Sequence, residues 1–524
     1  MDTKALRQKI LDLAIRGKLV PQDPNDEPAS VLLERIREQK LQMFKEGKLK
    51  KKDIKNDSVI FKGEDNLHYE KFQDGTVKCI EEEIPFEVPE GWAWERLTNL
   101  ATFSGGKTPS TSKPEYWDGN VLWVTSKDMK KKYITTSQLQ LSALGAEQMQ
   151  LYYPDTLLLV TRSGILRHTL PVSILKECAT INQDLKAIVL YMPQLAEYIY
   201  VCLKGMEEKI LLKYTKSGTT VENVNFSEFQ KILLPIAPIQ EINRIITSTI
   251  KAEHIISYIG KEKTLLTECI TKAKAKILDL AIRGKLVPQN SDDEPASVLL
   301  EHIRAEKEEL IKQGKIKRDK KESIIFKGED NSYYEKVGKK VRNIDDEIPF
   351  DLPRGWIWCR GYSCFDGMES TKPQGDFFAY IDIDAIDNKK HCIKEPKHLP
   401  VTKAPIRASR AVKNGSVLFS LVRPYLENIA LIEEKHSDCI ASTGFYVCNS
   451  NGMFEPDFMF FLMISGYIVN GLNQFMKGDN SPSISKDNIE YWLYPVPPIN
   501  EQQAISLKVK TILSMIENIE ESLS

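Results

Sequence analysis

KILDLAIRGKLVPQ occupies residues 9–22, and the same letters return without a change at residues 276–289. Three more pairs of segments continue the repeat along the chain: DEPASVLLE at 26–34 and 293–301, FKGEDN at 61–66 and 326–331, and EIPFEVPEGWAW at 83–94 against EIPFDLPRGWIW at 347–358. The offset between the copies falls from 267 to 264, as small deletions after a tandem duplication would produce. The sequence therefore predicts two related units in one chain.

Between these shared segments lie two blocks in which the copies differ almost completely, residues 95–232 and 359–492. The likeness returns after each block, with LLPIAPIQE at 233–241 and LYPVPPINE at 493–501. Each unit thus has a shared frame around a variable head. The expected regions are a first frame with a lysine-rich, exposed excursion (1–94), a first head (95–235), a central frame (236–346), a second head (347–495) and a last frame (496–524).

The frame that follows each head has the apolar spacing of a long helix. Steps of alternately three and four residues from Ile242 to Leu280 fall mostly on apolar side chains, and the same register runs from Gln502 to Leu523. Such a narrow seam is typical of a coiled coil rather than of a helix on a globular core. We therefore expect two long helices that pair in antiparallel orientation.

The offsets also relate the two ends of the chain to its middle. Ser524 corresponds to Thr264, and Met1 corresponds to Glu268, so the first residue continues the seam almost where the last one leaves it. This correspondence predicts a closed, circular arrangement of two equal units.

The heads contain apolar runs of the length of short β-strands. Gly, Pro and Asp punctuate these runs, which are VLWVTSKDM (121–129), TLLLVTRSG (156–164), LKAIVLY (185–191), FFAYIDIDAI (377–386), GSVLFSLVRP (415–424) and GFYVCN (444–449). Helical spacing occurs in AEYIYVCLKGMEEKI (196–210) and DFMFFLMISGYIVNGLNQFM (457–476). The predicted fold class is α/β in the mixed α+β sense, with two pseudo-symmetric globular heads separated by a long antiparallel two-helix coiled coil.

Composition limits the class of protein further. A chain of 524 residues is too long for one hydrophobic core and is expected to form several domains. Its nine cysteines include no C-x-x-C pair, which indicates neither a disulfide framework nor a zinc ribbon. The start is charged, and no apolar run approaches the roughly 18 residues of a spanning helix. These features predict a cytoplasmic protein that is neither exported nor embedded in a membrane.

The sequence carries no complete catalytic motif. SGGKT at 104–108 has the lysine of a phosphate-binding loop, but Ala101 stands where that motif requires glycine, and PSTSKP follows instead of a helix. The Asp or Asn before Pro-Pro-Tyr with which adenine methyltransferases grip a flipped base is missing, and the seven histidines have no metal or triad spacing. The tryptophan pairs in GWAW and GWIW are predicted to anchor the core rather than to stack on bases.

Motifs in both units resemble those of type I restriction enzyme specificity subunits. The first unit contributes GGKTPS, YWDGNVLWVTSKDM, LLLVTRSG, INQDLKAI and GTTVENVNFSEFQKILLPIAPIQE, and the second contributes VKNGSVLFSLVRPYLENIALI, IASTGFYV and GDNSPSISKDNIEYWLYPVPPINEQ. The likeness covers essentially the whole chain. Its most specific part is the Pro-Pro-x-x-Glu-Gln pattern that opens the last helix, from which the first unit departs with APIQE.

The resemblance implies a DNA-binding subunit without an active site of its own. Each head would be a target-recognition domain that reads one half of a split, asymmetric double-stranded DNA target. Two adenine-N6 methyltransferase (modification) subunits would dock on the helices, and motor-nuclease (restriction) subunits would complete the complex. S-adenosylmethionine, ATP and magnesium would belong to those partners, with no cofactor and no metal in this chain.

Side chains for DNA contact are predicted from their type and place. Base edges are read by Arg, Lys, Asn, Gln, Ser and Thr, and phosphates are held by basic side chains and small polar loops. The predicted contacts of the first head are Ser104, Gly105, Gly106, Lys107, Thr108, Ser110, Lys127, Arg162, Ser163, Arg167, Lys216, Thr219 and Thr220. Those of the second head are Lys372, Arg407, Arg410, Lys413, Arg423, Tyr425, Asn480 and Ser481.

Charge supports DNA binding more for the first head than for the second. Residues 96–235 hold 16 basic and 12 acidic groups, a net charge of +4, whereas residues 359–498 hold 14 and 16, a net charge of −2. The whole chain has a net charge of only −1, so any nucleic-acid surface must be local. The lysine runs KLKKK (48–52) and KIKRDKK (315–321) are further candidates for phosphate contact, although such runs are usually solvated surfaces.

Two other functions fit parts of the same pattern. A stand-alone bipartite DNA-binding regulator would need no partner subunits, and its long helices would only space the heads. A scaffold would use the heads to bind proteins, and no DNA duplex would compete for them. Neither alternative explains the circular duplication as simply.

Overall fold

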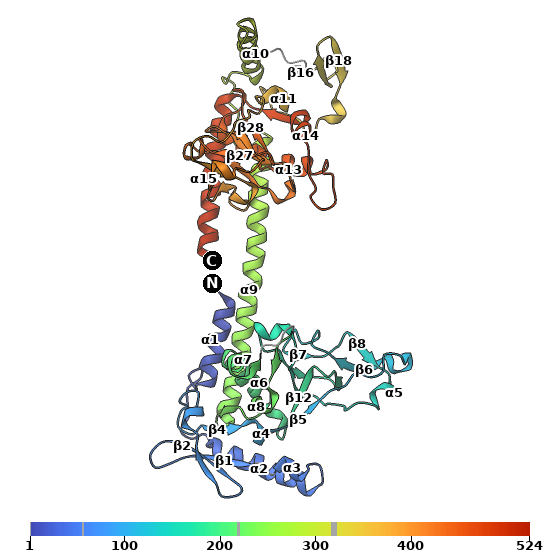
Figure 1. The fold of residues 1–524 in the computed structure, drawn as a ribbon, viewed down its shortest axis with the longest axis vertical. Coiled ribbons are helices and arrows are strands. Elements are labelled where there is room, and N and C mark those ends of the chain that lie inside the picture. The colour runs from blue at the N-terminus through green and yellow to red at the C-terminus, as the bar shows by residue number, and fades with distance from the viewer. Residues whose placement is uncertain (1, 55–56, 217–220, 316–321, 524) are drawn as a thin grey trace. The chain divides into compact units, whose positions relative to one another are not determined.

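A computed structural model of the chain describes every residue except 1, 55–56, 217–220, 316–321 and 524. Two compact units follow one another along the chain, Met1–Glu262 and Lys263–Ser524 (Figure 1). These two compact units support the prediction of two related units, whereas the five finer regions stay predictions. The circular arrangement also stays a prediction, because it depends on Met1 and Ser524, which lie outside the described residues. In the part of the chain that is described, no helix is long and apolar enough to cross a membrane.

The first unit contains a mixed α/β head and the frame around it. Its helices are α1 (Thr3–Ile15), α2 (Ala29–Lys45), α3 (Lys51–Ile54), α4 (Leu97–Leu100), α5 (Ala143–Ala146), α6 (Ala196–Gly205), α7 (Glu207–Tyr214), α8 (Phe226–Phe229) and the start of α9 (Ile239–Ile282). Its strands are β1 (Ser58–Lys62), β2 (His68–Phe72), β3 (Val77–Cys79), β4 (Ala93–Arg96), β5 (Ala101–Gly105), β6 (Trp117–Val124), β7 (Tyr133–Ile134), β8 (Leu139–Leu141), β9 (Leu157–Val160), β10 (Val172–Leu175), β11 (Ala179–Ile181), β12 (Leu185–Leu190), β13 (Thr215–Lys216), β14 (Asn223–Val224) and β15 (Leu233–Ile236).

The strand β9 shows why the first head needs a core on both faces of its sheet. All four of its side chains are buried, and alternate ones point to opposite faces. Leu157 and Leu159 join the larger core, which also holds side chains of α1, α2 and α6, whereas Leu158 and Val160 join a smaller core with residues of β6 and β11. The main sheet has the order β5-β12-β9-β10-β7, and β11-β6-β8 forms a second sheet.

The second unit repeats this plan with different side chains. Its helices are the end of α9, α10 (Ala296–Lys312), α11 (Gly361–Cys364), α12 (Pro456–Met463), α13 (Gly466–Asn473), α14 (Lys486–Tyr491) and α15 (Ile499–Leu523). Its strands are β16 (Ser323–Lys327), β17 (Tyr333–Val337), β18 (Lys340–Asn343), β19 (Ile357–Arg360), β20 (Phe377–Ile381), β21 (Ile386–Asp387), β22 (Cys392–Ile393), β23 (Lys397–Pro400), β24 (Ala408–Ala411), β25 (Val417–Ser420), β26 (Ile429–Leu431), β27 (Ile440–Ser442), β28 (Phe445–Cys448) and β29 (Leu493–Val496).

Strand β25 has the same two-sided burial as β9. Val417 and Phe419 join the core that contains α12, α13 and α15, and Leu418 joins a separate core on the other face. The runs predicted as strands and helices in both heads are confirmed, and so is the mixed α/β fold class. Two of the predicted helical runs are each broken into a pair of helices, α6 with α7 and α12 with α13.

Paired strands of the frame bring the two ends of each head together. β4 lies antiparallel to β15, with Trp94 opposite Pro235, and β19 lies antiparallel to β29, with Trp358 opposite Pro495. Trp94 and Trp358 are almost fully buried, which confirms that the tryptophan pairs anchor the core. The first tryptophan of each pair donates an indole hydrogen bond to a glutamate in the first turn of the long helix that follows the head: Trp92 to Glu241 on α9 at 2.9 Å, and Trp356 to Glu501 on α15 at 2.8 Å.

The long helices begin in the cores of the heads. In α9, the predicted seam positions Ile242 and Ile245 are fully buried with the first head, but Leu266 is 40% exposed. In α15, Ile505 and Val509 are buried with the second head, whereas Ile519 is 47% exposed. The first turns of the predicted seam are therefore part of a globular core, and the coiled coil stays a prediction.

The lysine-rich excursion predicted for residues 45–80 of the first frame contains a three-stranded sheet over residues 58–79. We call β1–β3 the first meander and its repeat, β16–β18, the second meander. An arginine fastens each meander to the frame: the partly buried Arg96 reaches Glu70 and Glu83, both at 2.8 Å, and the buried Arg360 reaches Glu335 at 3.1 Å and Glu347 at 2.6 Å. The first meander is thus exposed on one side, and its opposite side is fixed by charge pairs.

The Arg360 cluster predicts a pH-dependent contribution of Glu335 to stability. Burial acts to raise the pKa of Glu335, but Arg360 and Arg342 outweigh burial and lower this pKa from 4.5 to about 2. Because the folded-state pKa is the lower one, the stabilisation is complete above pH 4.5 and is lost as the pH falls toward 2. We expect Glu335→Gln to lower the urea midpoint at about pH 7 and to have a much smaller effect at about pH 3. An equal effect at both values would contradict this assignment.

Candidate nucleic-acid interface

Four strands of the first head end, and a fifth begins, at one edge of its sheets. β5 ends at Gly105, β6 at Val124, β9 at Val160 and β11 at Ile181, and β12 begins at Leu185. Backbone hydrogen bonds join the loops that follow: Lys107 N donates to Ile181 O (3.0 Å), Asn182 N to Val124 O (3.0 Å), and Thr161 N to Asp184 O (2.9 Å). We call segments 105–110, 125–128, 161–167 and 182–184 the first loop edge.

A short hairpin adds to this edge from a distant part of the chain. β13 and β14 pair Lys216 with Asn223, and Asn223 also bridges to Arg162. The nearly buried carboxylate of Glu222 accepts from Arg167 Nε at 2.6 Å. The structure therefore brings Arg162, Ser163, Arg167 and Lys216 together, whereas Thr219 and Thr220 lie outside the described residues.

Gly106 lies where the backbone of the edge is most crowded. A Cβ atom at this position would stand 2.0 Å from Ile181 O and 2.3 Å from Asn182 O, which are both backbone atoms. Only glycine permits this approach, since the backbone on each side belongs to a strand end and cannot move freely. The glycines of SGGKT thus serve a loop packed on a neighbouring strand rather than a phosphate-binding helix start.

The predicted side chains of the first loop edge differ in how firmly they are held. Ser104 Oγ lies 2.9 Å from Tyr152 OH, Thr108 Oγ1 donates to Gln183, and Ser163 Oγ accepts from Ile165 N. Four exposed cations form no ion pair with any residue in the described part of the chain: Lys107, Lys127, Arg162 and Lys216. Basic groups without an internal partner are the ones available to an external anion.

Sequence reasoning missed two groups at this edge. Trp117 and Trp123 meet edge to face, with centroids 5.1 Å apart, and their indole groups donate to Ser110 O and Lys107 O. Lys186, opposite Gly105 in the sheet, extends over the Phe226 ring. No regular spacing announces the two tryptophans, because a register shift between Trp117 and Val121 interrupts the alternation of β6 before Trp123. Lys186 gave no signal of its own.

The second head has an equivalent edge built from other residues. Leu421 N donates to Gly444 O (2.8 Å), Arg423 N to Pro482 O (2.7 Å), and Thr443 N to Arg407 O (2.8 Å). We call segments 407–409, 421–427, 443–444 and 477–483 the second loop edge. Of the predicted residues it holds Arg407, Arg423, Tyr425, Asn480 and Ser481, and Lys372 follows Thr371, whose N–H donates to Ser409 O.

Arg423 is held in an unusual conformation at this edge. Its φ of 49° lies in the left-handed region, which non-glycine residues occupy at a cost of roughly 1–2 kcal/mol. Its guanidinium donates to Asn480 O at 2.9 Å, so the 477–483 loop and the 421–427 loop fix each other. Strain of this kind persists where the surrounding structure enforces it, and it concentrates at functional sites.

Two predicted residues of the second head lie elsewhere. Lys413 is in the turn before β25, at the end of that strand opposite Arg423, and its ammonium is 4.0 Å from Asp366. Arg410 lies within β24 opposite Ala441, and its Nε is buried without a hydrogen-bond partner among the described residues. Lys477, which was not predicted, belongs to the second loop edge through two backbone bonds with Ser483.

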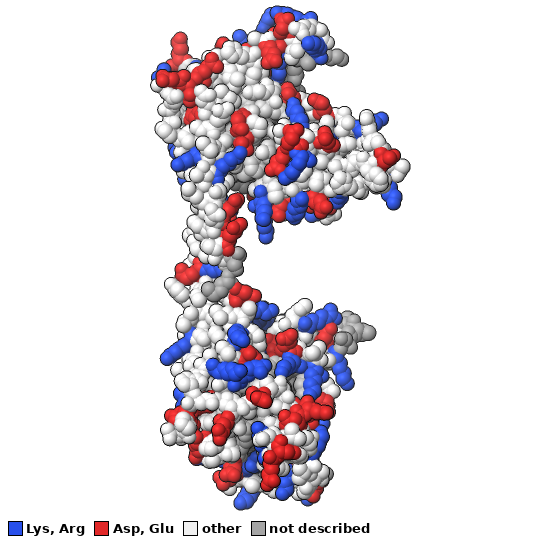
Figure 2. Space-filling model, turned by 90° about the vertical axis from the view of Figure 1, so that its left-hand side faces the viewer, with Lys and Arg blue, Asp and Glu red and all other residues white. Residues whose placement is uncertain are grey.

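On the face that Figure 2 displays, charge is not gathered into one continuous field on either unit. Figure 2 shows lysine and arginine side chains interleaved with acidic ones over both units on the face displayed. Some acidic groups at or beside the first loop edge already have partners within the chain: Glu222 forms an ion pair with Arg167, and Asp128 accepts a hydrogen bond from Thr125. A basic surface would therefore be local, as the composition predicts.

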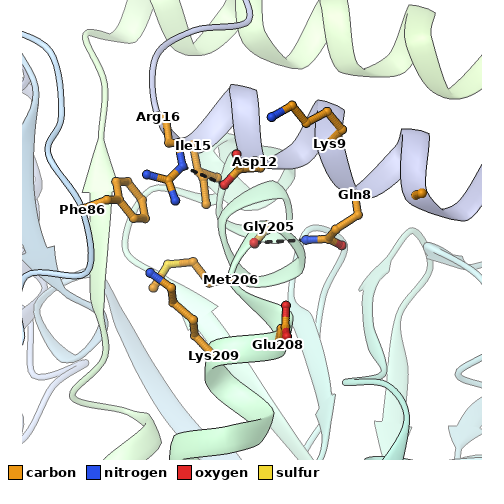
Figure 3. Close-up of a pocket in the computed structure, with 11 residues that line it drawn as sticks. Gln8, Lys9, Asp12, Ile15, Arg16, Phe86, Gly205, Met206, Glu208 and Lys209 are labelled. Carbon is orange, nitrogen blue, oxygen red and sulfur yellow. Dashed lines mark hydrogen bonds and ion pairs between the residues drawn. The ribbon is translucent and has the colours of Figure 1, made fainter.

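A separate groove of about 470 Å³ lies beside α1 in the first unit (Figure 3). Arg16 and Lys209 extend over the Phe86 ring, at 4.5 and 5.4 Å from its centre, and Gln8 donates to Gly205 O. The lining shares no residue with the first loop edge. Across the described residues, no group of three or more His, Cys, Asp or Glu side chains is placed to hold a metal ion.

Part of the chain matches a known protein family, and most of the chain is similar to known proteins. The family described as type I restriction modification DNA specificity domain matches residues 89–265, which include the first loop edge. The specificity subunit of the Escherichia coli type I restriction enzyme EcoAI is 25% identical over an alignment that covers 97% of this chain and 89% of that subunit. The EcoEI specificity subunit from the same species is 26% identical and covers 80% of this chain and 73% of its own length.

Two solved structures are also similar in part. The HsdS subunit from Thermoanaerobacter tengcongensis is 36% identical over a match that covers 33% of this chain and 46% of that chain, with a TM-score of 0.32. This match therefore spans less than half of the solved chain. The S subunit of a type I restriction-modification system from M. genitalium is 12% identical, covers 84% of this chain and 94% of its own, and has a TM-score of 0.28.

Proposed function

We propose that this chain belongs to the family of type I restriction enzyme specificity subunits, which it resembles over most of its length, and that it is the non-catalytic DNA-recognition subunit of a type I restriction-modification complex. Each head binds one half of a bipartite, asymmetric duplex target. Methylation of adenine N6, or restriction, is then carried out by partner subunits at the place that this chain selects. The chain itself contributes recognition and has no active site of its own.

The observation that carries this proposal is the convergence of strand ends on the loop edges. Each edge collects loops from distant parts of one head, and the first edge presents exposed basic side chains, among them Lys107, Lys127 and Arg162, that form no ion pair within the described residues. Arg, Lys, Asn and Gln on a rigid sheet edge suit base-edge contacts, and small polar loops such as 105–110 suit phosphate contacts. The predicted contact residues that lie on the two edges are therefore our proposed DNA-contacting residues.

Partners and cofactors are proposed from the family. Two modification subunits supply S-adenosylmethionine-dependent methylation, and restriction subunits supply ATP- and magnesium-dependent translocation and cleavage. Because these reactions act on chromosomal and incoming DNA, we propose that the complex works in the cytoplasm. The lysine runs at 48–52 and 315–321 stay candidates for phosphate contact, and residues 316–321 lie outside the described part.

The alternative of a stand-alone regulator is not favoured by the relatives, which are specificity subunits. A duplex-binding assay separates the two functions. We expect tight, site-specific binding only when the modification subunit of the same system is added to the chain. Equal specificity for the chain alone would instead favour the regulator.

Arg162→Ala is expected to weaken specific binding of the first half-target in the assembled complex. The guanidinium has no internal ion-pair partner among the described residues, and a base-reading arginine contributes about 1–3 kcal/mol, which is roughly a 5- to 150-fold change in Kd. Arg7→Ala is the matched control, because Arg7 is an exposed arginine of α1 away from the loop edge. Electrophoretic mobility shifts with duplexes altered in one half-target measure the effect. Equal losses for the two variants would remove Arg162 from the site.

A further inference from the structure

The two meanders each expose one face of apolar and aromatic side chains. Cross-strand pairs define the first face as Val59, Phe61, Tyr69, Lys71, Val77 and Cys79. They define the second face as Ile324, Phe326, Tyr334, Lys336, Val341 and Asn343. The opposite side of each meander carries the buried glutamates that pair with Arg96 and Arg360, so the exposed faces point away from the frame.

The chemistry of the two faces is the same at five of their six positions. Phe61 and Tyr69 stack across the strands with centroids 5.9 Å apart, and Phe326 and Tyr334 do so at 6.0 Å. Val77 and Val341 are 49% and 54% exposed on the outer strands. Single exposed apolar residues are ordinary, but a contiguous apolar patch that occurs twice is a sign of an interaction surface.

The folding of the meander explains only part of this likeness. A stacked cross-strand ring pair stabilises a hairpin, and so do the turns at Asn66 and Asn331, both with positive φ. No such reason applies to Val77 and Val341 on an outer strand. Nor does it apply to Lys71 and Lys336, since neither lysine forms an ion pair with any residue that the structure describes.

The internal duplication indicates what kind of partner these faces bind. The heads, which are proposed to read different half-targets, have diverged almost completely, whereas the meander faces have kept their chemistry. A surface that stays the same in both units fits a partner that is the same for both units. Each face carries one lysine among uncharged groups, and acidic residues flank it at Glu64, Asp65, Glu329 and Asp330, which disfavours phosphates.

We propose that the exposed faces of the two meanders are equivalent docking sites for two copies of one protein subunit, whose facing surface is apolar and carries a carboxylate opposite Lys71 and Lys336. This inference rests on the proposed function, under which the partner present in two copies is the modification subunit. Each copy buries one aromatic pair and one outer-strand valine, and its carboxylate neutralises the lysine. The meander then adds a protein contact to each unit that is separate from its loop edge.

The test uses charge reversal on one face at a time in the full chain. Lys71→Glu with Val77→Asp alters the first face, and Lys336→Glu with Val341→Asp alters the second. Lys62→Glu with Lys327→Glu is the matched control, because these lysines are neighbours of Phe61 and Phe326 in the same strands and alternate to the other side. Thermal unfolding of each variant shows that it is folded. Sedimentation then gives the number and affinity of purified modification subunits bound to each chain.

The wild-type chain and the control are expected to bind two modification subunits with similar affinity. Each single-face variant is expected to keep one subunit at full strength and to bind the other at least about tenfold more weakly, and the combined variant weakens both. Two subunits bound at wild-type strength by every variant would overturn the inference and leave the proposed function standing. A loss of duplex binding with unchanged subunit binding would also overturn it, in favour of a nucleic-acid contact. A wild-type chain that binds no modification subunit would overturn the proposed function together with this inference.

Discussion

Arg360→Ala is expected to lower the free energy of unfolding of the second unit by about 3 kcal/mol, the lower end of the cost of breaking a buried ion pair, because it removes the buried counter-charge of Glu335 and leaves only the exposed Arg342 paired with that carboxylate. The side chain of Arg360 is only 7% exposed and that of Glu335 only 2% exposed. The arginine also donates to Tyr491 O at 2.8 Å, at the end of α14, so its loss removes this hydrogen bond together with the ion pair that joins β17 of the second meander to β19. Urea unfolding at neutral pH measures this loss.

Arg342→Ala provides the matched control for that experiment. Arg342 contacts the same two carboxylates, Glu335 at 2.6 Å and Glu347 at 2.7 Å, but its side chain is 55% exposed. Exposed pairs of this kind contribute roughly 0–1 kcal/mol, so the control is expected to unfold almost like the wild type. Similar losses for both variants would show that burial of Arg360 is not what makes its ion pairs strong.

Gly106→Ala is expected to disrupt the first loop edge and abolish detectable binding of the first half-target. The new methyl group would meet the carbonyl oxygens of Ile181 and Asn182, at 2.0 and 2.3 Å, and the backbone must shift to admit it. Overpacking of this kind costs roughly 1–3 kcal/mol or more in stability, and here the displaced segment is the proposed contact surface itself. Duplex binding by the complex, with each half-target altered in turn, reports which head has failed.

Gly164→Ala distinguishes local crowding from a general intolerance of the loops. Gly164 belongs to the same loop edge, but no atom lies within 4 Å of the position that its Cβ would occupy, and its φ is not positive. We expect this variant to bind both half-targets as the wild type does. A Gly106→Ala chain with unchanged binding would mean that the 105–110 loop does not contact DNA.

Much of the fold could be predicted from local patterns in the sequence. Continuous apolar runs such as LLLV at 157–160 predicted strands covered on both faces, and burial of alternate side chains in two separate cores is the physical reason. The repeated segments predicted two related units. The tryptophans of GWAW and GWIW were predicted correctly to anchor the core, because a large indole side chain at the boundary between frame and head is usually mostly buried. These features depend on near neighbours in the sequence.

The candidate interface depends on contacts that sequence spacing does not record. Arg162 lies beside Asn223, and Lys107 beside Ile181, only because strands from distant segments pair in a particular register. For the same reason Lys413, chosen by residue type, lies at the opposite end of β25 from Arg423. The ordered meanders were also missed as sheets, since their many lysines conceal an alternation that becomes clear only when Glu70 and Glu335 are seen buried against arginines.

The central claim is that each unit of this chain reads one half of a bipartite DNA target. The most direct test is genome-wide mapping of N6-methyladenine in cells that hold the modification subunit and either the wild-type chain or a chain whose residues 359–492 come from a related subunit. We expect a two-part methylated motif in both strains, with one half changed and the other half unchanged by the replacement. A motif that changes in both halves, or one that is the same in both strains, would contradict the account.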